Sequence, residues 1–83
     1  MTTKEFNSSI RTNCFGEFLD QDGDSTVMYI DFDERKNCVL VGTICNVGLL
    51  VDFTVPYDDD FSIDENLQAA ADEIYLNGYS DFN

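Results

Sequence analysis

Hydrophobic residues recur at every second position along residues 49–55, and they fill both faces of residues 38–45. Residues 26–32 are rich in β-branched and aromatic residues, which are typical of a strand. Recurrence at every second position is typical of a strand with one buried face, and a segment that is apolar on both faces indicates a central strand. The polar segments that separate the three, residues 33–37 and 46–48, are typical of hairpin turns. The pattern therefore predicts an antiparallel meander.

A C-terminal helix over residues 62–76 is predicted by an apolar stripe and by signals at both ends. Ser62 and Glu65 match a capping box, in which each side chain accepts a hydrogen bond from the other residue's backbone N–H. Asn77 and Gly78 fit a left-handed C-terminal cap. We expect this helix to pack on the strand face that carries Leu49, Val51, Phe53 and Val55. The stripe follows the spacing of one helix face: Ile63, Leu67, Ala70, Ala71 and Ile74.

An N-terminal helix over residues 3–13 is predicted by Thr2 and Glu5, which form a second capping box, and by apolar residues that follow at four-residue spacing from Phe6. Gly16 and several poor helix formers weaken this pattern. Residues 14–19 therefore keep two interpretations, a continuation of the helix or a short edge strand. Residues 78–83 are expected to form a frayed tail.

These elements predict one α+β domain over residues 1–83, a three-stranded antiparallel β-meander flanked by an N-terminal and a C-terminal helix in the order α-β-β-β-α. We expect both helices on one sheet face. The other face is then either covered by the first helix or the tail, or it is an apolar surface that pairs two copies of the chain. The residues of this possible dimer face are Val27, Tyr29, Val39, Val41 and Leu50.

Acidic residues dominate the charge of the chain. Seventeen Asp and Glu residues face four Lys and Arg residues, giving a net charge of −13, and no basic residue follows Lys36. Such a surface attracts basic proteins and repels nucleic acid and anionic membranes, so we expect neither direct nucleic-acid binding nor membrane binding. No signal peptide or apolar membrane-spanning segment is visible in the sequence, which favours a cytoplasmic location.

The acidic residues concentrate in and after the turn that precedes the C-terminal helix. A helix dipole stabilises acids at its N-terminus by roughly 0.3–1 kcal/mol each, which accounts for only two or three of them. The excess suggests an anionic surface that binds a basic partner. The candidate partner-binding residues are Asp58, Asp59, Asp60, Asp64, Glu65, Asp72 and Glu73.

The turn after residue 19 resembles the calcium loop of the helix–loop–helix calcium-binding family. Asp20, Asp22, Asp24 and Asp31 stand at positions 1, 3, 5 and 12 of that loop. Ser25 replaces the glycine of the sharp turn, and Asp31 replaces a longer glutamate that binds through both oxygens. The favoured interpretation is an acidic turn without a metal, and weak divalent-metal binding is the alternative.

Enzymatic chemistry finds little support in the sequence. The chain has no His and no glycine-rich phosphate loop. Cys14, Cys38 and Cys45 match no zinc spacing and are interpreted as reduced core residues. We therefore expect a non-enzymatic protein without a cofactor.

Three functions agree with these patterns. The most directly testable is an acidic protein-binding module that mimics nucleic acid and occupies the basic groove of a DNA- or RNA-binding protein. In size, acidity and helix–three strands–helix order, the chain resembles small phage and mobile-element inhibitors, including some anti-CRISPR and antirestriction proteins, with no shared motif. The alternatives are a structural domain that homodimerises through its apolar sheet face and a metal-binding domain that uses the turn after residue 19.

Overall fold

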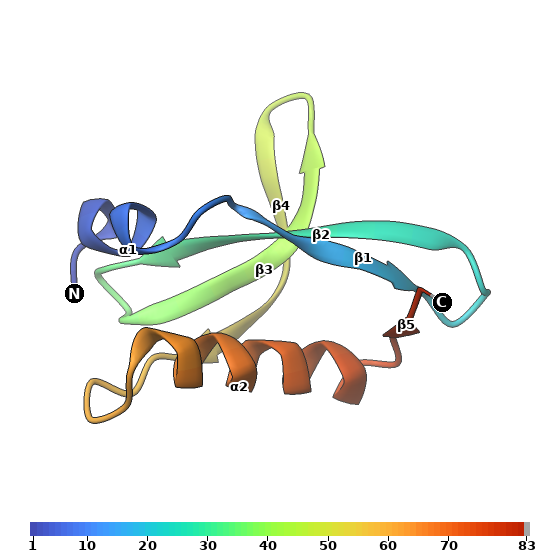
Figure 1. Ribbon diagram of the computed structural model, residues 1–83. Coiled ribbons are helices and arrows are strands. Elements are labelled where there is room, and N and C mark those ends of the chain that lie inside the picture. Colours follow the sequence, from blue (N-terminus) through green and yellow to red (C-terminus); the bar gives the residue numbers. More distant parts are fainter. Residues whose placement is uncertain (83) are drawn as a thin grey trace.

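A computed structural model, which describes residues 1–82, has an α+β architecture with a five-stranded sheet in place of the predicted three strands (Figure 1). All neighbouring strands are antiparallel, in the order β4-β3-β2-β1-β5. None of the helices within these residues is long and apolar enough to cross a membrane. The elements are α1 (Thr3–Ser9), β1 (Cys14–Leu19), β2 (Ser25–Asp33), β3 (Cys38–Cys45), β4 (Gly48–Pro56), α2 (Ile63–Leu76) and β5 (Ser80–Asp81).

The two additional strands lie where the sequence patterns were weakest. Residues 14–19 form β1, which pairs with β2, so the strand interpretation is confirmed and the helical one is wrong. The edge position is not confirmed, because the short strand β5 lies outside β1 in the sheet. Residues 80–81 pair with Phe18 and Leu19 of β1, so the prediction of a frayed tail is wrong for them. They satisfy backbone groups that the edge of β1 would otherwise expose. The part of the tail prediction that concerns Asn83 lies outside the described residues.

Both predicted capping boxes are confirmed. At α1 the Thr2 Oγ1 atom accepts a hydrogen bond from the Glu5 backbone N–H at 3.1 Å, and the Glu5 carboxylate accepts one from the Thr2 N–H at 2.9 Å. The bond from the Thr2 N–H to the Glu5 carboxylate is the largest cause of a lowered pKa of Glu5, and the Thr2 side chain lowers this pKa further. α1 ends at Ser9, short of the predicted residue 13, because Ile10 is extended and Asn13 exchanges hydrogen bonds with Ile30 of β2.

One buried cluster joins both helices to the sheet. Phe6 of α1 stacks on Phe32 of β2 with ring centroids 5.2 Å apart, and Tyr57 meets the same Phe32 ring edge-on at 5.4 Å. The predicted stripe of α2 faces this cluster, with Ala70 and Ile74 fully buried. The buried cluster comprises Phe6, Phe18, Met28, Ile30, Phe32, Val39, Val41, Val55, Tyr57, Ala70 and Ile74.

The predicted assignment of β3 to the outer sheet face is wrong. Val39 and Val41 are 0% exposed and belong to the core. They pair directly with Phe32 and Ile30 of β2, and residues directly opposite each other in an antiparallel pair lie on the same face. A strand that is apolar on both faces gives no sequence signal for which face is buried.

A β-bulge at Asp52 corrects the prediction for β4 as well. Val41 pairs with Phe53 but Gly42 pairs with Val51, so Asp52 has no partner on β3. One extra residue reverses the alternation of the side chains beyond it. Phe53 packs against the core and Val55 is buried in it, as predicted. Leu49 and Val51, on the far side of the bulge, turn to the opposite face.

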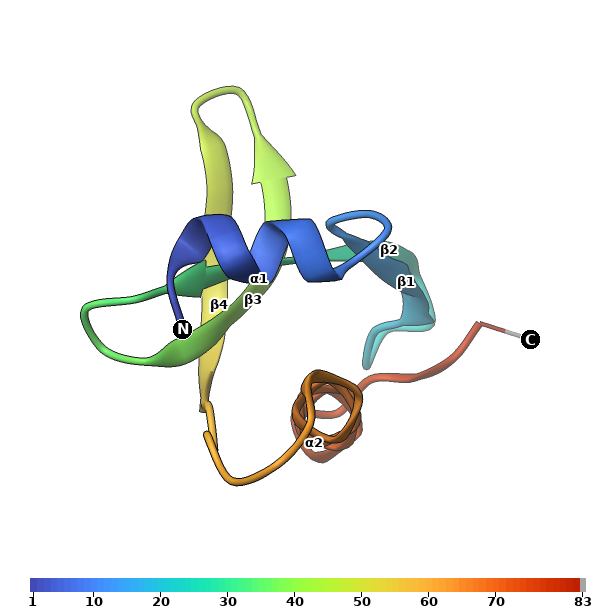
Figure 2. The ribbon, with the colours of Figure 1, turned by 60° about the vertical axis from the view of Figure 1, so that its left-hand side comes forward.

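Beyond the bulge, the ends of β3 and β4 leave the sheet as a two-stranded arm, which we define as residues 43–51. Figures 1 and 2 show the arm projecting to the side of the sheet opposite α2. Gly42 stands at the base of the arm, where an added Cβ would lie 1.9 Å from the carbonyl oxygen of Leu50. Leu50, which was predicted on the possible dimer face of the sheet, lies on this arm instead. Val27 and Tyr29 of β2, from the same predicted set, lie on the sheet face away from the core and are partly accessible to solvent.

Candidate functional site

The acidic loop, which we define as residues 57–61, connects β4 to α2 and is held in place by Asn66. The Asn66 side chain is buried at the first turns of α2, where its Oδ1 accepts a hydrogen bond from the Asp58 N–H at 2.8 Å. Its Nδ2 donates to the carbonyl oxygens of Asp58 and Ser62, each at 2.9 Å. These bonds tie the main chain of the loop to the helix, so the loop has a defined shape.

Several acidic side chains of the predicted partner-binding set have structural tasks. Asp58 Oδ1 accepts a hydrogen bond from the Asp60 N–H at 2.9 Å, and Asp59 Oδ2 accepts one from Asn37 Nδ2 at 3.2 Å. Glu65 completes the capping box of α2, and Asp72 accepts a hydrogen bond from Gln68.

The remaining members of the set have no comparable task. Within residues 1–82, the carboxylates of Asp60, Asp64 and Glu73 accept no hydrogen bond. Asp60 and Asp64 are exposed to solvent, and Glu73 is half-buried. These charges therefore exceed what capping and turn formation use.

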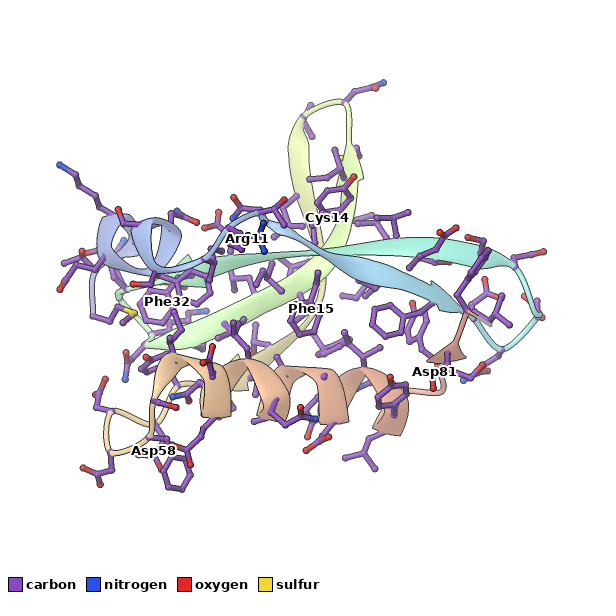
Figure 3. The ribbon with its side chains drawn as sticks, viewed as in Figure 1. Arg11, Cys14, Phe15, Phe32, Asp58 and Asp81 are labelled. Atoms are coloured by element: carbon purple, nitrogen blue, oxygen red, sulfur yellow. The ribbon has the colours of Figure 1, made fainter. Side chains whose placement is uncertain are left out.

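The seven residues do not form one straight ridge. Successive residues of a helix are rotated by about 100°, so Asp64 and Glu73, nine positions apart, lie on opposite flanks of α2. Glu65 and Asp72 lie between them on the exposed side. In Figure 3, Asp58 of the acidic loop lies near the N-terminal end of α2, and Asp81 lies near its C-terminal end. The acidic surface thus covers the exposed half of α2 and continues into the loop.

An open hollow lies against the acidic loop. Phe61, Asp59 and Asp60 contribute to its lining and are exposed to solvent. An exposed aromatic ring beside carboxylates suits a surface that contains both apolar and cationic groups, such as the stem and head of an arginine or lysine side chain. The hollow is lined by Pro56, Tyr57, Asp58, Asp59, Asp60, Phe61, Asn66 and Ala69.

The calcium-loop register is only partly reproduced. Carboxylate oxygens of Asp20, Asp22 and Asp24 lie within 4.8 Å of one another. Asp31 does not join them, because it lies within β2, where it pairs with Leu40 and accepts a hydrogen bond from the Phe32 N–H. Asp20 Oδ1 also accepts hydrogen bonds from the N–H groups of Asp22 and Asp24, each at 2.9 Å. Turn formation is therefore sufficient to explain Asp20, and the four-residue set is wrong at Asp31.

The interpretation of the cysteines as core residues holds for one of the three. Cys38 is buried at the start of β3, while Cys14 and Cys45 are exposed, and all three are free thiols. Burial raises the pKa of Cys38, and the nearby Asp33 raises it further, against a smaller opposing effect of Lys36.

We expect a maleimide to modify Cys14 and Cys45 of the native protein rapidly and Cys38 slowly. The raised pKa lowers the thiolate fraction of Cys38 at neutral pH, and the thiolate is the nucleophile. Mass spectrometry over time should show two additions before the third, with the third becoming fast in denaturant. Three additions at one rate in the native protein would contradict the burial of Cys38.

The sequence analysis missed two features of the surface. Asn66 falls on the apolar stripe of α2, three residues after Ile63, and a polar residue in that position is a readable sign of a buried hydrogen-bonding role. The arm lies within a run of fourteen residues, 38–51, that contains no Asp, Glu, Lys or Arg. In a chain this acidic, so long a segment without charged residues is the sequence feature that could have indicated the arm.

The surface that results combines a defined acidic loop, the exposed half of α2 and, on the opposite side of the sheet, an uncharged arm. No protein-family model, curated protein or solved structure was found to match this chain.

Proposed function

We propose that the protein is a non-enzymatic binding module whose acidic loop and exposed α2 surface occupy a basic groove of a nucleic-acid-binding protein. The observation that supports this most is the excess of carboxylates over structural need: Asp60, Asp64 and Glu73 accept no hydrogen bond within residues 1–82, and no basic residue follows Lys36. Charges without a local task cost stability through mutual repulsion, so a gain elsewhere has to offset them.

Rigidity also favours this proposal. Asn66 and the capping box fix the acidic loop relative to α2, so little conformational entropy is lost when its carboxylates meet a partner. Along α2, Asp64 and Asp72 are eight residues apart, which places them about 12 Å apart along the axis, with the uncharged Gln68 midway between them. That distance is close to two steps between successive phosphates along a nucleic-acid strand. Phe61 adds an apolar contact beside the charges.

Replacing Asp59 and Asp60 together with asparagine is expected to weaken partner binding and to flatten its dependence on salt. Asparagine keeps an acceptor oxygen, so the loop retains its shape while two charges are lost. The measurement is capture of proteins from a lysate of the source cells at about 0.1 M and about 1 M salt, where the Debye length falls from about 10 to 3 Å. Captured proteins should be basic, released by salt and displaced by added DNA or RNA.

The matched control replaces Asp22 and Asp24 with asparagine. This removes the same charge from the turn at the opposite end of the sheet (Figure 1). If both double variants lose binding equally, only net charge matters and the loop is not the site. If neither loses binding, or nucleic acid does not compete, the proposal is wrong.

A further inference from the structure

The arm exposes apolar side chains that the fold itself does not cover. Val47 at its tip is 96% exposed, and Leu50, Ile44 and Val51 are 57%, 55% and 42% exposed. Ile44 and Leu50 point to opposite faces of the arm, because Leu50 pairs with Thr43 and Ile44 pairs with Leu49. Both faces of the arm are thus accessible. Several exposed apolar side chains gathered on one element of a small protein indicate an interaction site.

The arm also has an open backbone edge. β4 is the outermost strand of the sheet, so on its outer side every second N–H and C=O group lacks a strand partner. Proteins usually protect such an edge with charged residues or proline, but residues 48–51 contain neither. A two-stranded hairpin that stands free of a core is only marginally stable in water. The arm therefore gains from pairing with another strand.

The lack of charge on the arm indicates which molecule binds it. Residues 38–51 carry no charged side chain, while the chain as a whole carries −13. A basic partner would gain no electrostatic attraction at the arm. A second copy of this chain, by contrast, is repelled by every acidic surface and can approach most easily at an uncharged one.

The direction of the arm agrees with this assignment. It projects away from α2 in both views of the ribbon (Figures 1 and 2). Two copies joined arm to arm hold their acidic helices on the far sides of the pair. From these observations we infer that the arm binds the arm of a second copy about a twofold axis, with the two β4 edges antiparallel. Both acidic surfaces then remain free, so this inference does not depend on the proposed function.

Sedimentation velocity of the full chain over a wide concentration range tests the inference. The wild type should form a dimer that is as strong or stronger at about 1 M salt than at about 0.1 M, because salt screens the repulsion between the copies. Leu50→Lys and Ile44→Lys, one on each face of the arm, should be compared. At least one should raise the dissociation constant by about tenfold or more, since the twofold axis buries the new charge twice.

Leu76→Lys is the matched control, because Leu76 is 79% exposed on α2 and lies away from the arm. It should not raise the dissociation constant, and neither should the Asp59 and Asp60 double variant, because both changes reduce the repulsion between the copies. A wild type that stays monomeric at all concentrations overturns the inference, and capture of a different protein that the arm variants abolish would assign the arm to that partner. A dimer that is weakened by salt, or is unaffected by both arm variants, also overturns it.

Discussion

Replacing Gly42 with alanine is expected to lower the free energy of unfolding by more than about 3 kcal/mol, at or beyond the upper end for overpacking. The new Cβ would lie 1.9 Å from the Leu50 carbonyl oxygen, 2.8 Å from the Leu50 carbonyl carbon and 3.0 Å from the Val51 Cα. These are main-chain atoms, so no side-chain rotation relieves the collision. At about 0.05–0.15 kcal/mol per residue, a chain of 83 residues has a total stability of about 4–12 kcal/mol. The variant should therefore be close to unfolding.

The measurement is urea denaturation followed by circular dichroism, with Gly23→Ala as the control. Gly23 has a φ of +82°, and no atom lies within 4 Å of the position that its Cβ would take, so alanine there meets only backbone strain. That strain costs about 1–2 kcal/mol. If Gly42→Ala is no more destabilising than Gly23→Ala, β3 and β4 do not approach as closely as described.

Replacing Asn66 with leucine is expected to lower the free energy of unfolding by about 1–3 kcal/mol, the cost of leaving one polar group without its hydrogen bond. The change leaves the Asp58 N–H without its partner. The Asp58 and Ser62 carbonyls lose the Asn66 side chain but still accept hydrogen bonds from the backbone N–H groups of Phe61 and of residue 66. The gain from a more apolar side chain offsets part of this loss. Because the same bonds shape the acidic loop, amide exchange of residues 58–62 should accelerate as well.

Gln68→Leu provides the comparison on the same helix. Gln68 is exposed, and within residues 1–82 its side chain donates only to the Asp72 carboxylate, so its replacement should change stability by less than about 0.5 kcal/mol. Denaturation midpoints for the two variants should differ clearly. Equal midpoints would mean that the buried amide contributes no more than an exposed one, contrary to the hydrogen bonds it makes.

The segments with strong hydrophobic patterns and clear end signals were predicted well from the sequence. Residues 38–45 form β3 with the expected bounds, and α2 follows Ser62 with the expected stripe. The segments with weak patterns were not resolved. β5 has only two residues, too few for any period, and β1 contains an extra residue, Phe15, between its pairings at Cys14 and Gly16. Figure 3 shows Phe15 pointing toward α2, and it packs against the core.

Side-chain direction was harder to predict than secondary structure. Asp52 is polar and stands between Val51 and Phe53, so it fits the alternation of a regular strand and hides the bulge. Only the pairing with β3 reveals the bulge. Val41 and Gly42 are neighbours on β3, whereas their partners on β4, Phe53 and Val51, are separated by Asp52. For the acidic surface, the identities of the residues were evident from the sequence, but their placement on opposite flanks of α2 follows from helix geometry that a list of acids does not convey.

Asn66 also separates the shape of the acidic loop from its chemistry. It binds the main-chain groups of Asp58 and Ser62, which any residue provides, whereas the carboxylate of Asp60 accepts no hydrogen bond within residues 1–82 and that of Asp59 accepts one from Asn37. The conformation of the loop backbone therefore depends little on which side chains the loop carries. We expect that other residues can be placed at positions 59–61 without disturbing the core, so the protein can serve as a small scaffold whose binding preference is changed by engineering this loop.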